Sequence, residues 1–198
     1  TGDCIMPREG LFVVARAGGA IQPGDAVRTD PALDRIRYAV VTVSDRGAAG
    51  EREDRSGPTA CETLEGLVSA HRVDLRVVPD ERPTIAAALR ELCDDHVVDV
   101  IFTSGGTGLA PRDVTPEATA DVWDRQIPGI AEAIRAAGLA KPPHAMLSRA
   151  LCGQRGRTLI INLSGSPRAV QEQIEAVAPA LHHAVSVVSG VPQDCARA

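Results

Sequence analysis

The stretch Val98–Thr119 reads VDVIFTSGGTGLAPRDVTPEAT and decides the fold class. Val98–Phe102 is an apolar run typical of a buried strand, and it leads directly into the glycine-rich segment Ser104–Gly108. After a polar turn, the sequence Thr115-Pro116-Glu117 predicts a helix start with Thr115 as the N-cap. A strand, a glycine-rich loop and a capped helix in this order predict an anion site, because backbone N–H groups and a helix N-terminus both attract negative charge.

Composition and charge exclude several classes of protein. The 198 residues are 44% hydrophobic, carry a net charge of −5 and include only 2% aromatic residues. We therefore expect one domain of ordinary size, and no nucleic-acid binding, because base-stacking platforms need aromatic side chains. No apolar run reaches the roughly 20 residues that span a bilayer, so no membrane contact is expected. The single lysine, Lys141, excludes the phosphate-binding loop that ends in Gly-Lys.

The cysteine pattern points to reduced thiols. None of the five cysteines forms a CxxC pair, and no Cys/His spacing resembles a zinc site. We therefore predict a cytoplasmic protein whose cysteines are unpaired, since disulfides are rare in that compartment.

The first 33 residues differ in pattern from the rest of the chain. Leu11–Arg16 alternates in polarity and glycine turns flank it, which predicts two short strands with too little apolar surface to fold alone. The string GDCIMPREGLF…GGAIQPGDAV resembles the closing strands of a MOSC domain, a module linked to molybdenum-cofactor sulfur chemistry. We therefore divide the chain into an N-terminal extension (1–33), a main domain (35–190) and a tail (191–198).

The main domain alternates between predicted strands and helices. Continuous valine-rich runs favour strands buried on both faces, and the intervening segments have helical spacing of apolar residues. Alternation of this kind predicts an α/β fold, a mostly parallel sheet between helices. The expected strands are Tyr38–Val43, Asp74–Val78, Val98–Thr103, Ala145–Cys152 and Arg157–Leu163, the last two as a hairpin; the expected helices are 56–70, 83–95, one from Thr115, 127–137 closed by Gly138, and 167–188, bent or divided at Pro179.

Polar residues follow every strand of the predicted parallel sheet. Ser44-Asp45-Arg46, Pro79-Asp80-Glu81, Thr103–Gly108 and Asn162–Ser166 each begin where an apolar run ends. Ligands of such folds bind beyond the carboxyl ends of the strands, so these segments are expected to form one site. The loops Gly105–Gly108 and Ser164–Ser166 would offer main-chain donors to phosphate groups.

Two aspartates at this edge, Asp80 and Asp113, are the predicted Mg²⁺ ligands. Magnesium prefers carboxylate oxygens together with substrate phosphates and water, and it neutralises charge during phosphoryl or nucleotidyl transfer. A helix cap is the competing interpretation for Asp80. Among the arginines Arg46, Arg112, Arg149 and Arg168, which could bind phosphate bidentately, Arg112 is preferred. Structural or surface roles are expected for the histidines, of which only His144 is a candidate to lie near this edge.

A dinucleotide-binding interpretation is rejected. The glycine-rich loop contains Gly106-x-Gly108, but the third glycine position of that fingerprint is Pro111.

With these motifs in place, the sequence resembles the MogA/MoaB family of molybdenum-cofactor biosynthesis proteins. The resemblance covers about residues 35–190 and rests on seven motifs in order: TVSDR at Thr42–Arg46, RSGP at Arg55–Pro58, PDE at Pro79–Glu81, TSGGTGLAPRDVTPEAT at Thr103–Thr119, IPGIAEAIR at Ile127–Arg135, LSRA at Leu147–Ala150 and INLSGSP at Ile161–Pro167. It implies a three-layer αβα sandwich, a homotrimer or hexamer, and Mg-ATP-dependent adenylylation of molybdopterin that primes metal insertion.

The resemblance also implies residue roles. Its functional aspartates correspond to Asp80 and Asp113, as catalytic residues and Mg²⁺ ligands. The substrate and nucleotide contacts expected from the motifs and strand ends are Ser44, Ser104, Gly105, Gly106, Thr107, Gly108, Arg112, Ser148, Ser164, Gly165 and Ser166.

Two other functions stay open on the sequence alone. A protein of this fold could hold molybdopterin without turnover, and a sulfur-transfer module could use Cys4. Retention of both aspartates favours the enzyme. One departure from the family pattern is Leu163-Ser164-Gly165-Ser166-Pro167, where the family usually has LPG-x-P.

Overall fold

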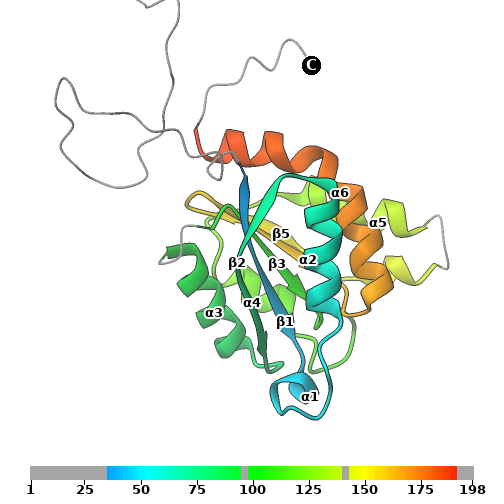
Figure 1. Ribbon diagram of the computed structural model, residues 1–198. Coiled ribbons are helices and arrows are strands. Elements are labelled where there is room, and N and C mark those ends of the chain that lie inside the picture. Colours follow the sequence, from blue (N-terminus) through cyan, green and yellow to red (C-terminus); the bar gives the residue numbers. More distant parts are fainter. Residues whose placement is uncertain (1–34, 95–97, 140–142, 191–198) are drawn as a thin grey trace, which may run out of the picture.

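The computed structural model describes residues 35–94, 98–139 and 143–190. Six strands and their connecting helices form one α/β domain (Figure 1). The elements are β1 (Ile36–Val43), α1 (Asp45–Ala48), α2 (Ser56–Leu67), β2 (Ala70–Val78), α3 (Arg82–Asp94), β3 (Val100–Ser104), α4 (Thr115–Ala120), β4 (Arg125–Gln126), α5 (Pro128–Leu139), the 3-10 helix η2 (Pro143–Leu147), β5 (Cys152–Arg155), β6 (Thr158–Leu163) and α6 (Pro167–Val188).

The sheet is mostly parallel, as predicted. Its strand order is β2-β1-β3-β6-β5-β4, with β2, β1, β3 and β6 parallel and the β4–β5 and β5–β6 pairs antiparallel. The register aligns Thr42 with Ser104 and Ser104 with Leu163, so β1, β3 and β6 end at the same edge. The polar segments that follow these strands are therefore neighbours, although about 60 residues separate each from the next.

Helices cover both faces of the sheet and complete the predicted three-layer αβα sandwich. Alternate residues of β1 face opposite layers: Tyr38 and Val40 pack with α2, α5 and α6, whereas Ala39 and Val41 pack with α3 and α4. All four side chains are fully buried. The valine-rich run of β1 therefore supplies both halves of the core, which is the expected consequence of a central parallel strand.

One expected strand is partly wrong, and one short strand was not expected. The predicted strand Ala145–Cys152 is wrong in its first part: η2 occupies most of it, and β5 begins only at Cys152. The Leu151 N–H donates to the Asn162 side chain, and only the Leu151 carbonyl bonds to the Asn162 backbone, so regular pairing with β6 begins at Cys152. Strand β4 was missed because its two exposed polar residues show no hydrophobic pattern.

The helix ends also refine the prediction. Gly138 lies inside α5 and does not close it, since the helix runs to Leu139. Helix α6 continues through Pro179 as one element and changes direction along its length (Figure 1), as expected where a proline removes a backbone hydrogen bond.

Two further predictions concern membranes and thiols. No helix among the described residues is long and apolar enough to cross a membrane. Cys61, Cys93 and Cys152 are free thiols in this part of the chain. The predicted short strands of residues 1–33 and the tail 191–198 lie outside the described residues.

Candidate functional site

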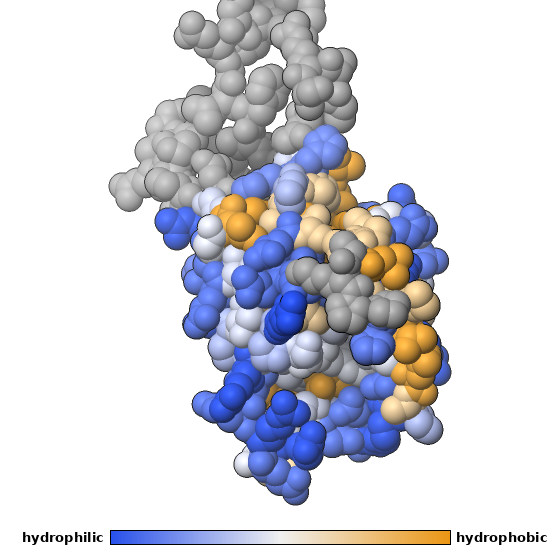
Figure 2. Space-filling view, turned by 90° about the vertical axis from the view of Figure 1, so that its right-hand side faces the viewer, coloured by the Kyte–Doolittle hydropathy of each residue, from blue (hydrophilic) through white to orange (hydrophobic). Residues whose placement is uncertain are grey.

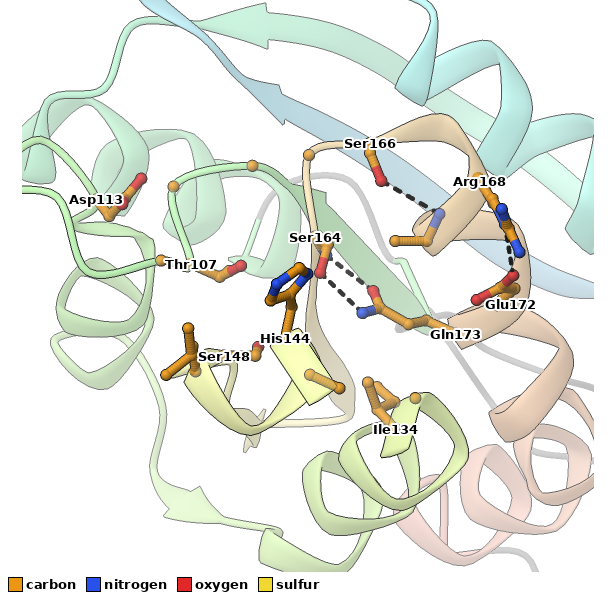
Figure 3. A pocket seen from close by; sticks show the side chains of 18 of the residues that line it. Thr107, Asp113, Ile134, His144, Ser148, Ser164, Ser166, Arg168, Glu172 and Gln173 are labelled. Carbon is orange, nitrogen blue, oxygen red and sulfur yellow. Dashed lines mark hydrogen bonds and ion pairs between the residues drawn. The ribbon is translucent and has the colours of Figure 1, made fainter. Parts of the chain in front are cut away.

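A pocket of about 640 Å³ opens beyond the carboxyl ends of β3 and β6 (Figure 3). Helix α5, η2 and the first turns of α6 form its other walls. It brings together nine of the residues predicted from sequence: Gly105, Gly106, Thr107, Gly108, Asp113, Ser148, Ser164, Gly165 and Ser166. The segments meet here because their strands end at one edge of the sheet.

The glycine-rich loop after β3 has a backbone that only glycine supports well. Gly105 has a φ of +108° and Gly106 a φ of +62°. A Cβ on Gly105 would lie 2.4 Å from the carbonyl oxygen of Val43, on the neighbouring strand β1. The missing side chains let this backbone turn tightly along the pocket wall. The Gly105 N–H donates to the Leu163 carbonyl oxygen, which leaves the amides from Gly106 to Gly108 for an anionic ligand.

Thr115, at the start of α4, holds the same loop by hydrogen bonds. The predicted N-cap role of Thr115 is wrong, because Val114 precedes α4 and no side chain caps it. The buried Thr115 hydroxyl donates instead to the Gly105 carbonyl oxygen at 2.9 Å, and the Thr115 N–H donates to the Gly106 carbonyl oxygen. These two hydrogen bonds tie the glycine loop to the start of α4.

The second loop, Ser164–Ser166, enters α6 beside the first. Ser166 is the N-cap, as predicted, and its hydroxyl accepts the Ala169 N–H at 3.3 Å. Gln173 holds Ser164 through two bonds, both at 2.8 Å: its Nε2 donates to the Ser164 hydroxyl and its Oε1 accepts the Ser164 N–H (Figure 3). A Cβ on Gly165 would lie 3.3 Å from the Gly105 Cα, so the loops are in close contact.

Asp113 lines the pocket at the end of the glycine loop. Its Oδ2 accepts the Ala110 N–H at 2.8 Å and lies 2.8 Å from where a Cβ on Gly108 would stand. The carboxylate therefore packs against the loop backbone, and a larger residue than glycine would displace it. Its Oδ1 makes no hydrogen bond to a described residue.

Asp80 lies behind the glycine loop and is not part of the pocket lining. Its Oδ2 accepts the Asp45 N–H at 2.8 Å, while its own N–H donates to Asp45 Oδ1 at 2.9 Å. A Cβ on Gly106 would lie 3.3 Å from Asp80 Oδ1. Burial, and to a smaller degree the nearby Asp45 and Asp113 carboxylates, raise the pKa of Asp80 above its ordinary value.

The preferred arginine, Arg112, is engaged by Asp45. Its Nη2 donates to Asp45 Oδ1 at 2.6 Å and its Nε donates to Oδ2 at 3.0 Å. This bond lowers the pKa of Asp45. Both side chains are exposed, and neither lines the pocket. Of the other proposed arginines, Arg168 lines the pocket and pairs with Glu172.

Ser44 and Ser104 belong to a second, smaller pocket of about 210 Å³ on the far side of the same loop. Gly105, Gly106 and Gly165 line both pockets. Ser44 caps α1 by accepting the Gly47 N–H at 3.1 Å, and the Ser104 hydroxyl donates to the Ser164 carbonyl at 3.0 Å.

Asp54 stabilises one wall of this second pocket and was missed from sequence. Its Oδ1 accepts the N–H groups of Ser56 and Gly57 at the start of α2, and its Oδ2 accepts the Thr42 hydroxyl. An aspartate two residues before a helix is the sequence signal that could have identified it.

The carboxylate oxygens of Asp80 and Asp113 are ligands of the kind that Mg²⁺ prefers. Each carboxylate uses Oδ2 in a hydrogen bond to the backbone, and Oδ1 makes none to a described residue. The described part of the chain holds no group of three or more His, Cys, Asp or Glu residues suited to a metal ion. Two carboxylates are nevertheless enough for magnesium when substrate phosphates and water supply the remaining ligands.

Three further pocket residues lie on helices and were not assigned to the site from the sequence. His144 projects from η2 into the pocket, and Glu172 and Gln173 line it from α6 (Figure 3). His144 lies directly before the segment that was expected to be a strand. The helix residues carry no motif, and only the position of α6 beside the loops brings them to the site.

Comparisons with known proteins agree with this geometry. Residues 39–183 match the family described as "Probable molybdopterin binding domain". A molybdopterin adenylyltransferase of Helicobacter pylori is 40% identical over 159 residues, which are 80% of this chain and 90% of that protein. The molybdopterin adenylyltransferase of Escherichia coli K12 is 38% identical over 73% of this chain and 75% of its own length.

Solved structures show the same fold. The molybdopterin biosynthesis enzyme MoaB from Thermus thermophilus is 50% identical, with a TM-score of 0.75 over 79% of this chain and 98% of that one. The Mog protein from Mycobacterium ulcerans is 41% identical, with a TM-score of 0.72 over 79% of this chain and 98% of that one.

Proposed function

The chain belongs to the molybdopterin-binding domain family, and we propose that it is a molybdopterin adenylyltransferase that acts in molybdenum-cofactor biosynthesis. The observation that carries this proposal is the pocket in which Asp113, two glycine-rich loops and the start of α6 converge. Main-chain donors and a helix N-terminus suit the phosphates of both substrates, molybdopterin and ATP.

In the proposed reaction, the terminal phosphate of molybdopterin attacks the α-phosphorus of ATP. A new P–O bond forms, the bond between the α-phosphorus and the bridging oxygen breaks, and pyrophosphate leaves with its electron pair. The amides of Gly106, Thr107 and Gly108, and those of Gly165 and Ser166, orient the phosphates, and α5 and η2 form the facing walls. The protein needs only to align the two substrates and to stabilise charge.

We further propose that Asp80 and Asp113 hold Mg²⁺. When bound there, the ion would neutralise charge on the reacting phosphates. The unused Oδ1 atoms of the two carboxylates support this role. The raised pKa of Asp80 also supports it, because a carboxylate that is costly to ionise alone gains from a neighbouring cation.

The second candidate function is a binder of molybdopterin that does not turn it over. The observation behind this candidate is the family match, whose description names molybdopterin binding and no turnover. The presence of both Asp80 and Asp113 beside the glycine loop favours the enzyme.

The deciding experiment measures incorporation of AMP from Mg-ATP into molybdopterin. The wild type should form adenylated pterin and pyrophosphate. Asp80→Asn and Asp113→Asn should each lower kcat by roughly 10²-fold or more, as the loss of a charge-stabilising group does. Asp121→Asn is the control, because Asp121 is an exposed aspartate that pairs with Arg82 outside the site.

Three outcomes would change these assignments. A wild type that binds molybdopterin but transfers no AMP supports the binder. Full activity in both site variants refutes the Mg²⁺ assignment. If Asp121→Asn lowers kcat as much as Asp80→Asn and Asp113→Asn do, the effect is not specific to the site.

We also propose, from the family resemblance, a homotrimer or hexamer. Leu139, Met146 and Leu147 on α5 and η2 are 49%, 62% and 49% exposed, which supports an additional covering surface. Hydrophobic patches lie on the side of the molecule that carries α5 (Figure 2). Sedimentation analysis tests this state.

Cytoplasmic location and a MOSC-like origin of residues 1–33 complete the proposal. The free thiols Cys61 and Cys152, both buried, suit a reducing compartment.

A further inference from the structure

We propose that Arg149 is a positioning residue for the adenylyl transfer, acting through Asp113 and the end of the glycine loop. This inference rests on the proposed function. Arg149 follows Ser148 in the pocket wall, and the sequence suggests a phosphate ligand. The structure assigns it another task, since its donors are directed at protein acceptors.

One guanidinium connects three parts of the site. Arg149 Nε donates to the Gly108 carbonyl oxygen at 2.7 Å, Nη2 donates to the Asp113 carbonyl oxygen, and Nη1 pairs with the Glu117 carboxylate on α4. The Arg149 N–H also donates to the Thr107 carbonyl oxygen at 2.9 Å. The side chain is about one-third exposed, so these contacts are partly protected from water.

The segment that Arg149 holds has little other support. Between Gly108 and Asp113, all four residues are exposed, and Leu109 is 65% exposed. The other bonds of this segment are the local pair between Ala110 and Asp113 and the exposed ion pair of Arg112 with Asp45. Arg149 holds both ends of the segment at once, so it sets the direction in which the Asp113 carboxylate faces the pocket.

Lysine cannot reproduce this arrangement. A guanidinium directs several donors along fixed directions in one plane, whereas an ammonium group is a point charge on a flexible stem. Arg149→Lys should therefore keep the attraction to Glu117 and lose at least one of the two carbonyl contacts. Arg149→Met should lose all side-chain contacts while keeping much of the apolar stem.

The test compares AMP transfer by full-length wild type, Arg149→Lys, Arg149→Met and the control Arg155→Met. Arg155 bridges the Asp94 carboxylate and the Val122 carbonyl oxygen in the same way, but at the β5–β6 turn, away from the site. Arg149→Met should lower kcat by roughly 10–100-fold, as small misplacements of reacting groups do, with a smaller change in KM. The kcat of Arg149→Lys should lie between those of the wild type and Arg149→Met. Arg155→Met should keep the wild-type kcat.

A double-mutant cycle separates positioning from general stability. If Arg149 acts through Asp113, Arg149→Met should lower kcat less than about twofold further in an Asp113→Asn background. If the kcat of the double variant falls by the product of the two single-variant factors, the proposal is overturned. Equal kcat losses in Arg149→Met and Arg155→Met would also overturn it.

Hydrogen exchange gives a readout that does not need activity. Arg149→Met should accelerate amide exchange in residues 105–114 by about tenfold or more relative to Arg155→Met, because the segment loses both anchors. If the wild type transfers no AMP, the proposed function fails and exchange alone decides the positioning role. Unchanged exchange in residues 105–114 would overturn it.

Discussion

Replacement of Gly105 by alanine tests whether the glycine loop is held as tightly as the structure indicates. Gly105 has a φ of +108°, and its added Cβ would lie 2.4 Å from the Val43 carbonyl oxygen. That oxygen belongs to β1, which pairs with β2 on one side and β3 on the other, so it cannot move away without breaking strand pairing.

Two costs add in this variant. A non-glycine residue in a disfavoured backbone region costs about 1–3 kcal/mol. Forcing a methyl group into a packed region costs about 1–3 kcal/mol more. The free energy of unfolding should therefore fall by about 2–6 kcal/mol, out of the roughly 5–15 kcal/mol typical of a domain.

Gly156→Ala is the matched control. Gly156 also has a positive φ, +53°, but nothing lies within 4 Å of its added Cβ, and it occupies the turn between β5 and β6. This variant should lose only about 1–2 kcal/mol from backbone strain. The difference between the two variants isolates the contact with Val43.

Urea unfolding and AMP transfer should be measured on both variants. If the Gly105→Ala loop relaxes to avoid Val43, the amides move and kcat should fall by roughly 10²-fold. Gly156→Ala should keep wild-type kcat. Equal stability of the two variants, combined with full activity of Gly105→Ala, would refute the reasoning.

Three further predictions concern the groups around the loop. Thr115→Val should lower the free energy of unfolding by about 1–3 kcal/mol in urea titration, because the Gly105 carbonyl loses its buried donor, and Thr115→Ser should restore most of it. His144→Asn should raise KM for molybdopterin severalfold at unchanged kcat in steady-state assays, because an exposed wall residue contributes uniform binding. The hydrogen bond from Arg149 lowers the pKa of Glu117. The Arg149–Glu117 pair therefore stabilises the fold fully above the ordinary glutamate pKa of about 4.3, and this stabilisation is lost as pH falls through the lowered pKa of Glu117. Arg149→Met should flatten that part of the curve of unfolding free energy against pH, measured by urea titration.

The sequence by itself was sufficient for the fold class. Valine-rich runs such as Tyr38–Val43 and helical spacing after Ser56 predict buried parallel strands with helices on both faces, and the structure confirms this. The rule that ligands bind beyond strand ends also predicted one site for the loops Gly105–Gly108 and Ser164–Ser166. Both loops line the same pocket. Local composition carries these features because burial on two faces and tight turns restrict residue type directly.

Tertiary structure decided which polar groups face the ligand. Thr115 donates to Gly105 although its position predicts a cap, Arg112 pairs with Asp45, and Arg149 holds the Asp113 segment although an arginine near a phosphate loop suggests a ligand. His144 enters the pocket from a 3-10 helix that the sequence did not predict. The partner of a hydrogen-bonding side chain is chosen by three-dimensional neighbours, which can be dozens of residues away in the chain. The glycine-rich stretch around Gly105 was therefore readable from sequence as an anion loop, while its anchors, Val43 beside it and Arg149 at its far end, were set only by the folded arrangement of the strands.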